Sequence, residues 1–141
     1  MNDLRRRLVE TALEWEKLYG VAPSITSAIS EYDAALLIGL TPNEYQSCMQ
    51  GRTAVSRGFD FICKGNQYQV KANRPSGKKG SKVTLVGKAT NYEWDFLIWV
   101  HYNPAFEIQE VWLLDRDFYI ENFDSKKRLS PNDMRKGSRL L

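Results

Sequence analysis

Two short segments near the middle of the chain have the residue pattern of a β-hairpin with one polar and one apolar face. Residues 58–62 form a short apolar run that contains Asp60. In residues 67–73, Gln, Lys and Asn alternate with Tyr, Val and Ala, so a strand would direct the two sets to opposite faces. The link at 63–66 is short and holds a Gly-Asn pair, which favours a tight turn. The pattern therefore predicts a hairpin in which Asp60 lies close to Gln69 and Lys71.

The rest of the chain divides into helices, then strands, then short helices. Apolar residues at helical spacing predict an amphipathic helix over 4–18, a helix buried on every side over 26–40, and a helix over 42–50 opened by Thr41-Pro42. Further strands are expected at 83–87, 94–102 and 108–114, with a turn at 103–105. Short helices are expected after Asp115 and Ser130. This order predicts an α/β sandwich with a central mixed β-sheet flanked by helices.

Length, hydropathy and cysteine usage predict one domain without a membrane segment. A chain of 141 residues can bury a core that needs no staples. No stretch approaches the ~20 apolar residues of a membrane span, and no apolar signal segment follows the charged start, so we expect a cytoplasmic protein with no membrane partner. Cys48 and Cys63 stand apart from each other and from His residues, which favours reduced thiols over a zinc site. One disulfide in a secreted protein is the alternative.

Positive charge is concentrated around the predicted hairpin. The net charge is +3, yet residues 61–92 hold seven basic residues and no acid, which leaves −4 for the rest of the chain. A phosphate-rich partner requires such a concentration of positive charge. The alternative is a solvated loop at 76–82, kept soluble by its lysines.

Three elements carry an acid or a lysine in a particular order along the chain. Glu31 opens the apolar helix, Asp60 lies on the first hairpin strand, and Gln69-Val70-Lys71 lies on the second. This order resembles the PD-(D/E)XK nuclease superfamily, which includes restriction-endonuclease-like and Holliday-junction-resolvase-like enzymes. In that pattern a helix supplies an acid, a strand supplies an Asp, and the neighbouring strand supplies an acid-x-Lys. Phe59 stands where the motif has Pro, and Gln69 replaces the second carboxylate, so the chain resembles a Gln-x-Lys variant.

The resemblance implies a restriction-endonuclease-like sandwich and a metal-dependent DNA endonuclease, acting in restriction, phage defence, or DNA repair and recombination. The cofactor would be Mg²⁺, for which Mn²⁺ can substitute. The implied catalytic residues are Glu31, Asp60, Gln69 and Lys71. The implied metal ligands are Glu31, Asp60, Gln69 and the carbonyl of Val70. The residues expected to hold backbone phosphates are Asn73, Arg74, Lys78, Lys79 and Lys82.

The partners implied are DNA and a second subunit. One site of this kind cuts one strand, so cutting a duplex requires a homodimer or a partner subunit. The first helix, with Leu4, Leu8 and Trp15, or the Trp-bearing strands could supply the apolar surface for such a contact. Two other functions fit the same residues, a catalytically inactive nucleic-acid-binding subunit and a protein-interaction module of a defence system.

Each candidate residue also has a structural explanation. Asp60 could be a turn acid beside Lys64, and Gln69 and Lys71 could belong to an ordinary solvated strand face. Alternative acids are Glu10, Glu14 or Asp33 in place of Glu31, and the pair Glu93 and Asp95. His101 is the only histidine and fits a structural role better than a catalytic triad. The tryptophans fit core packing better than base stacking, because they lie within apolar runs.

Overall fold

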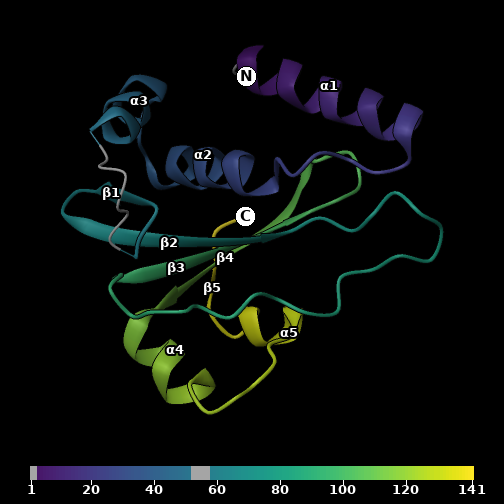
Figure 1. The fold of residues 1–141 in the computed structure, drawn as a ribbon. Coiled ribbons are helices and arrows are strands. Elements are labelled where there is room, and N and C mark those ends of the chain that lie inside the picture. The colour runs from purple at the N-terminus through teal and green to yellow at the C-terminus, as the bar shows by residue number, and fades with distance from the viewer. Residues whose placement is uncertain (1–2, 52–57) are drawn as a thin grey trace.

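The computed structural model describes residues 3–51 and 58–141, and it shows a β-sheet with helices on both faces (Figure 1). The helices on one face are α1 (Asp3–Tyr19), α2 (Thr26–Ile38) and α3 (Pro42–Gln50). Those on the other face are α4 (Arg116–Phe123) and α5 (Pro131–Met134). The architecture confirms an α/β class with a central mixed sheet and flanking helices.

The sheet has five strands, in the order in which they occur along the chain. They are β1 (Phe61–Cys63), β2 (Asn66–Asn73), β3 (Phe96–Tyr102), β4 (Ile108–Asp115) and β5 (Ser138–Arg139). The pair β2–β3 is parallel and the other neighbours are antiparallel. A parallel pair needs a connection that crosses one face of the sheet, and residues 74–95 provide it.

The hairpin predicted from the sequence is present as β1–β2. Cys63 pairs with Asn66, so the turn consists of Lys64 and Gly65. Both have positive φ, 50° and 82°, which is the geometry that two-residue hairpin turns require. β1 is shorter than the strand expected at 58–63, because Gly58 has φ +71° and the extended backbone begins only after it.

The three N-terminal helices lie close to their predicted positions. Thr41 and Glu44 form a capping box that starts α3. α2 ends at Ile38 rather than residue 40, because Gly39 has φ +123° and ends the helix. The expectation that this helix is buried on every side is wrong in part. Ala34 and Ala35 are buried, but Leu37 lies on the outward side and is exposed.

The crossover at 74–95 contains a second departure from expectation. Residues 83–87 do not form a sheet strand in the described structure; they make one isolated bridge, Val86 to Leu129. Val86 is buried there against the layer that holds α4 and α5, so the apolar pattern reflects packing on the sheet rather than pairing within it. The sequence analysis also missed β5, whose two residues are too few to show alternation.

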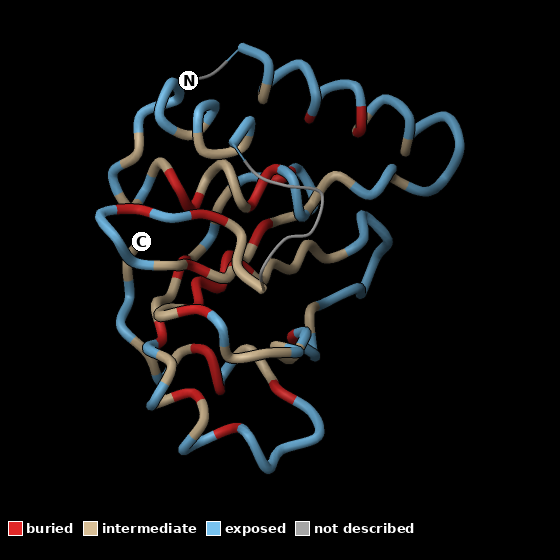
Figure 2. The backbone as a smooth tube through the Cα atoms, turned by 60° about the vertical axis from the view of Figure 1, so that its left-hand side comes forward, coloured by how far each residue is buried: buried red, intermediate tan, exposed pale blue. Residues whose placement is uncertain are grey.

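Alternate residues of the central strands bury into two cores, one on each face of the sheet. Ile98 and Val100 of β3 pack toward α2, whereas Leu97 and Trp99 pack toward the crossover and α4. Figure 2 shows these buried segments through the middle of the molecule. Trp94 and Trp99 are fully buried, which confirms their role in core packing. Both cysteines are free thiols, and within the described part of the chain no helix is long and apolar enough to cross a membrane.

Candidate functional site

The hairpin brings Asp60 against the middle of β2. The last register pair is Phe61 with Tyr68, and the Asp60 backbone N–H continues the ladder by donating to the Tyr68 carbonyl at 2.7 Å. The Asp60 carboxylate then turns toward β2 and accepts the Val70 N–H at 2.7 Å. The predicted proximity of Asp60 to the Gln-x-Lys strand is therefore present in the structure.

The Val70 carbonyl faces the same edge of β2 as this carboxylate. Along a strand, the peptide groups of residues two apart point the same way, and the Tyr68 carbonyl points to the β1 side. The Val70 N–H also points there, because it donates to Asp60. A carboxylate and a peptide carbonyl thus meet at the edge of β2, just beyond the first β1–β2 pair.

Gln69 and Lys71 project from the face of β2 that lies under the crossover. Their neighbours Tyr68 and Val70 belong to the core on the α2 side, and successive side chains alternate between faces. The Lys71 stem passes Gly87, where an added side-chain carbon would lie 3.9 Å from Lys71 Cδ. Both polar side chains are half-buried, so this is not a freely solvated strand face.

Glu31 comes from the other layer of the sandwich. It is half-buried on α2, which packs against β2 and β1 from the side opposite to Gln69 and Lys71. Its carboxylate can join the other candidates only around the edge of β2 where the β1 pairing ends. The structure therefore groups Asp60 with Gln69, Val70 and Lys71 on the hairpin, and holds Glu31 on a separate element.

Asp33 and Glu10, two alternatives to Glu31, are engaged elsewhere. Asp33 accepts two hydrogen bonds from Arg5, both at 2.7 Å, and one from the Tyr102 hydroxyl at 2.6 Å. Burial, followed by the nearby Asp33 carboxylate, raises the pKa of Tyr102, so the hydroxyl remains a donor. Glu10 forms an exposed pair with Arg6 at 3.0 Å. These contacts give both acids structural roles.

Glu93 is an acid whose position became clear only from the structure. A side chain at Gly58 would overlap the Glu93 carboxylate, so this carboxylate lies directly against the backbone two residues before Asp60. Asp95, its suggested companion, instead accepts the Gln67 N–H at 2.8 Å and helps to align β2 with β3. The sequence offered no signal for the Gly58 contact, because it depends on how the crossover returns to the sheet.

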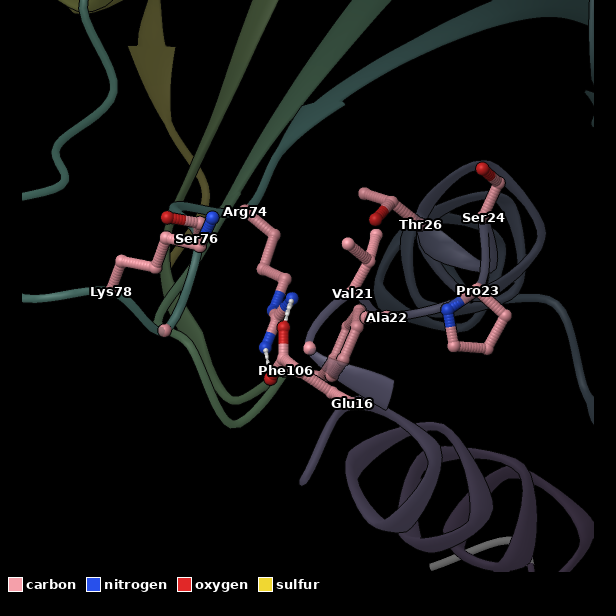
Figure 3. A pocket seen from close by; sticks show the side chains of 12 residues that line it. Glu16, Val21, Ala22, Pro23, Ser24, Thr26, Arg74, Ser76, Lys78 and Phe106 are labelled. Atoms are coloured by element: carbon pink, nitrogen blue, oxygen red, sulfur yellow. Dashed lines mark hydrogen bonds and ion pairs between the residues drawn. The ribbon is translucent and has the colours of Figure 1, made fainter. Parts of the chain in front are cut away.

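The expected phosphate-binding residues fall into two groups. Arg74 forms two hydrogen bonds with Glu16, at 2.8 and 2.9 Å, and its side chain is only 8% exposed (Figure 3). Asn73 accepts from Trp99 Nε1 at 2.9 Å and donates to the Leu85 carbonyl at 3.0 Å. These two residues hold the ends of the crossover in place. The exposed residues of the expected set are Lys78, Lys79 and Lys82.

A pocket of about 530 Å³ opens beside Arg74, between the α1–α2 connection and the start of the crossover (Figure 3). The Arg74 guanidinium also lies over the Phe106 ring, 4.3 Å from its centre. Lys78 contributes to the rim of this pocket. The hairpin residues Asp60, Gln69 and Lys71 are not part of its lining, so this pocket is separate from the candidate site.

A second polar cluster lies on the sheet face that carries Lys71. Glu110 accepts from Arg135 at 2.7 and 2.8 Å and from Trp112 Nε1 at 2.7 Å, and it lies 3.1 Å from His101 Nδ1. The Arg135 hydrogen bonds, followed by smaller contributions from His101 and Trp112, lower the pKa of Glu110 to about 2. His101 is therefore bound to a structural ion pair, in agreement with its predicted role.

The donor set at the hairpin suits a hard cation. Among residues 3–51 and 58–141, no three His, Cys, Asp or Glu side chains form a metal-binding group. The expected set contains only two such side chains, Glu31 and Asp60, and draws its other oxygens from an amide and a peptide carbonyl. Oxygen donors of these kinds are the ligands that Mg²⁺ accepts. No protein-family model matches the chain, and no curated protein sequence matches it.

Proposed function

We propose that the chain is a metal-dependent DNA endonuclease with a restriction-endonuclease-like sandwich and a Gln-x-Lys site. The observation that carries this proposal is the hydrogen bond of 2.7 Å from the Val70 N–H to Asp60, which joins the acid of one strand to the Gln69-Val70-Lys71 segment of the next. The order of elements supports it, because α2 precedes a hairpin whose two strands carry the acid and the lysine.

The hairpin residues supply oxygen ligands. Asp60 contributes an anionic oxygen, while Gln69 and Val70 contribute neutral ones, and Glu31 completes the set from α2. Bound Mg²⁺ would polarise the scissile phosphate and favour deprotonation of the attacking water. Because Gln69 is neutral, the set carries one negative charge fewer than an acid-x-Lys site, so metal affinity should be lower in the absence of DNA.

Lys71 provides the only positive charge on the candidate strand. Its stem is fixed between β2 and Gly87, so the ammonium group is held near one face of the hairpin rather than free in solvent. From there it would orient the attacking water or stabilise the negative charge that develops on the phosphate. Glu93 is an additional acid at this end of the hairpin, which its contact with Gly58 holds in place.

DNA would bind through the exposed lysines of the crossover. These lysines, Lys78, Lys79 and Lys82, can contact backbone phosphates without reading the base sequence. We leave Arg74 and Asn73 out of this surface, because their side chains are bound to Glu16 and Trp99. Phosphate contacts of this kind give affinity that falls with salt.

The test is incubation of supercoiled plasmid and branched DNA with the protein and Mg²⁺ or Mn²⁺, beside the variant Asp60→Asn. Asparagine can still accept the Val70 N–H, so the hairpin is retained while the anionic ligand is lost. We expect metal-dependent nicking by the wild type, and a rate for the variant that is lower by about 10²-fold or more. Equal cutting by both proteins would contradict the assignment of Asp60.

A catalytically inactive nucleic-acid-binding subunit is the second candidate. The observations that favour it are the exposed lysines of the crossover and the neutral Gln69 in place of an acid. Such a protein would bind DNA with strong salt dependence but would leave plasmid intact in either metal. Binding and cleavage measured on the same preparation distinguish the two functions.

A further inference from the structure

The first helix carries an exposed apolar stripe with the spacing of a coiled coil. Its members follow each other at intervals of four and three residues: Leu4, Leu8, Thr11, Trp15 and Leu18. Leu4 is 64% exposed, Trp15 52% and Leu18 68%. An alternation of four and three places all of these residues along one side of a helix, the pattern by which two helices pack together.

The stripe is not the surface by which α1 attaches to the rest of the protein. α1 buries Val9 and Ala12 instead, and Figure 2 shows most of its length exposed. Two ion pairs fasten the helix near its ends, Arg5 with Asp33 and Glu16 with Arg74. The helix is thus fixed on the body with the stripe facing outward.

An apolar groove of about 480 Å³ adjoins the first half of this stripe. Leu4 and Leu8 form one wall, and residues of α2 and α3, including Ala28, Pro42 and Tyr45, form the other. The second half of α1 carries bulky exposed rings instead, because Trp15 and Tyr19 lie against each other with ring centres 4.7 Å apart. One half of the helix therefore offers a hollow and the other half a projection.

We propose that the stripe packs antiparallel against the same stripe of a second copy of this chain. A two-fold axis near the middle of α1 sets Leu4 against the partner's Trp15, and Leu8 against the partner's Thr11. Each groove then receives the partner's aromatic pair, so hollow and projection match twice. This is the self-complementary contact that two-fold symmetry requires.

The charges beside the stripe select the antiparallel arrangement. Arg7 and Glu14 are seven residues apart and lie on the same flank, both exposed. Across antiparallel helices the same flanks meet, so Arg7 faces the partner's Glu14 and Glu14 faces the partner's Arg7. In a parallel pair this flank would meet Arg5 and Ala12 of the partner, which are turned toward the body and cannot complement it.

The contact is independent of the nuclease chemistry proposed above, since it uses no residue of the hairpin. The 17 residues of α1 span about 25 Å, enough for more than three turns of contact. The buried tryptophans of the sheet offer no comparable surface, because Trp94 and Trp99 are fully covered. α1 is therefore the surface that a second copy would use.

Light scattering and sedimentation equilibrium over a range of concentrations test the proposal. We expect a dimer, and we expect Trp15→Glu to weaken it by at least about tenfold in Kd. Leu85→Glu is the matched control, because Leu85 has nearly the same exposure, 53%, and lies on the crossover. A strictly monomeric wild type, or a dimer that Trp15→Glu leaves intact, overturns the proposal and leaves the stripe to a different protein.

A charge exchange tests the register directly. Arg7→Glu and Glu14→Arg each place like charges opposite one another and should each weaken the dimer, whereas the double variant restores opposite charges and should recover most of the affinity. Both positions are exposed, so the fold is retained, which circular dichroism checks. A double variant no tighter than the single variants overturns the antiparallel pairing.

Discussion

Replacing Glu110 by glutamine should remove a defined, pH-dependent part of the stability. The Glu110 side chain is 14% exposed and accepts from Arg135 and Trp112, with His101 beside it. Together these partners lower its pKa from 4.5 to about 2, with the Arg135 hydrogen bonds as the largest cause. Glutamine can still accept from Trp112, but it has no charge with which to hold the Arg135 guanidinium.

The pKa shift sets both the size and the sign of the effect. A carboxyl whose pKa is lower in the folded state stabilises the protein above its unfolded pKa, and this contribution is lost as the pH falls toward the folded value. A shift from 4.5 to about 2 corresponds to roughly 3 kcal/mol at neutral pH. About 2 kcal/mol of this is gone by pH 3, because the unfolded chain is by then protonated at Glu110.

Urea unfolding followed by tryptophan fluorescence at pH 7 and pH 3 measures the effect. The difference in unfolding free energy between the wild type and Glu110→Gln should be large at pH 7 and should shrink by about 2 kcal/mol at pH 3. Glu121→Gln, at an exposed position of α4, is the matched control and should differ little from the wild type at either pH. A Glu110→Gln difference that is equal at both pH values would refute the reasoning.

Three further predictions concern other parts of the molecule. Asp33→Ala leaves the Arg5 guanidinium and the Tyr102 hydroxyl without their shared acceptor, and should lower the unfolding free energy by about 3 kcal/mol in the same urea assay. Gln69→Glu adds an anionic oxygen beside Asp60 and should tighten Mg²⁺ binding; a calorimetric titration without any gain would remove Gln69 from the ligand set. The lysine loop should contribute about 0.9 to the log–log salt slope of DNA binding per contact, lost on alanine substitution of Lys78, Lys79 and Lys82.

Local patterns in the sequence were sufficient for most of the elements. The turn at Lys64 and Gly65, the capping box of Thr41 and the cap at Asp115 each depend on a few neighbouring residues, so their positions could be predicted. The proximity of Asp60 to β2 was predictable for the same reason, because a two-residue turn fixes the register of both strands.

Features that depend on distant contacts could not be predicted. Val86 has the pattern of a strand residue, but its partner is Leu129, far along the chain. Arg74 was assigned to phosphate binding by its place in a basic segment, and only the fold brings Glu16 to it. Glu93 reaches Gly58 through the path of the crossover, which no local periodicity encodes.

The most direct test of the proposed nuclease is the plasmid-cleavage rate of Lys71→Ala beside that of Lys64→Ala. The two lysines belong to one hairpin, but Lys71 projects from the candidate face of β2 whereas Lys64 lies in the exposed turn. A positioned group of this kind contributes about 10²–10⁴ in rate, so Lys71→Ala should be slower by that factor in Mg²⁺ while Lys64→Ala cuts as fast as the wild type. A Lys71→Ala protein that cuts as fast as the wild type would contradict the proposed site.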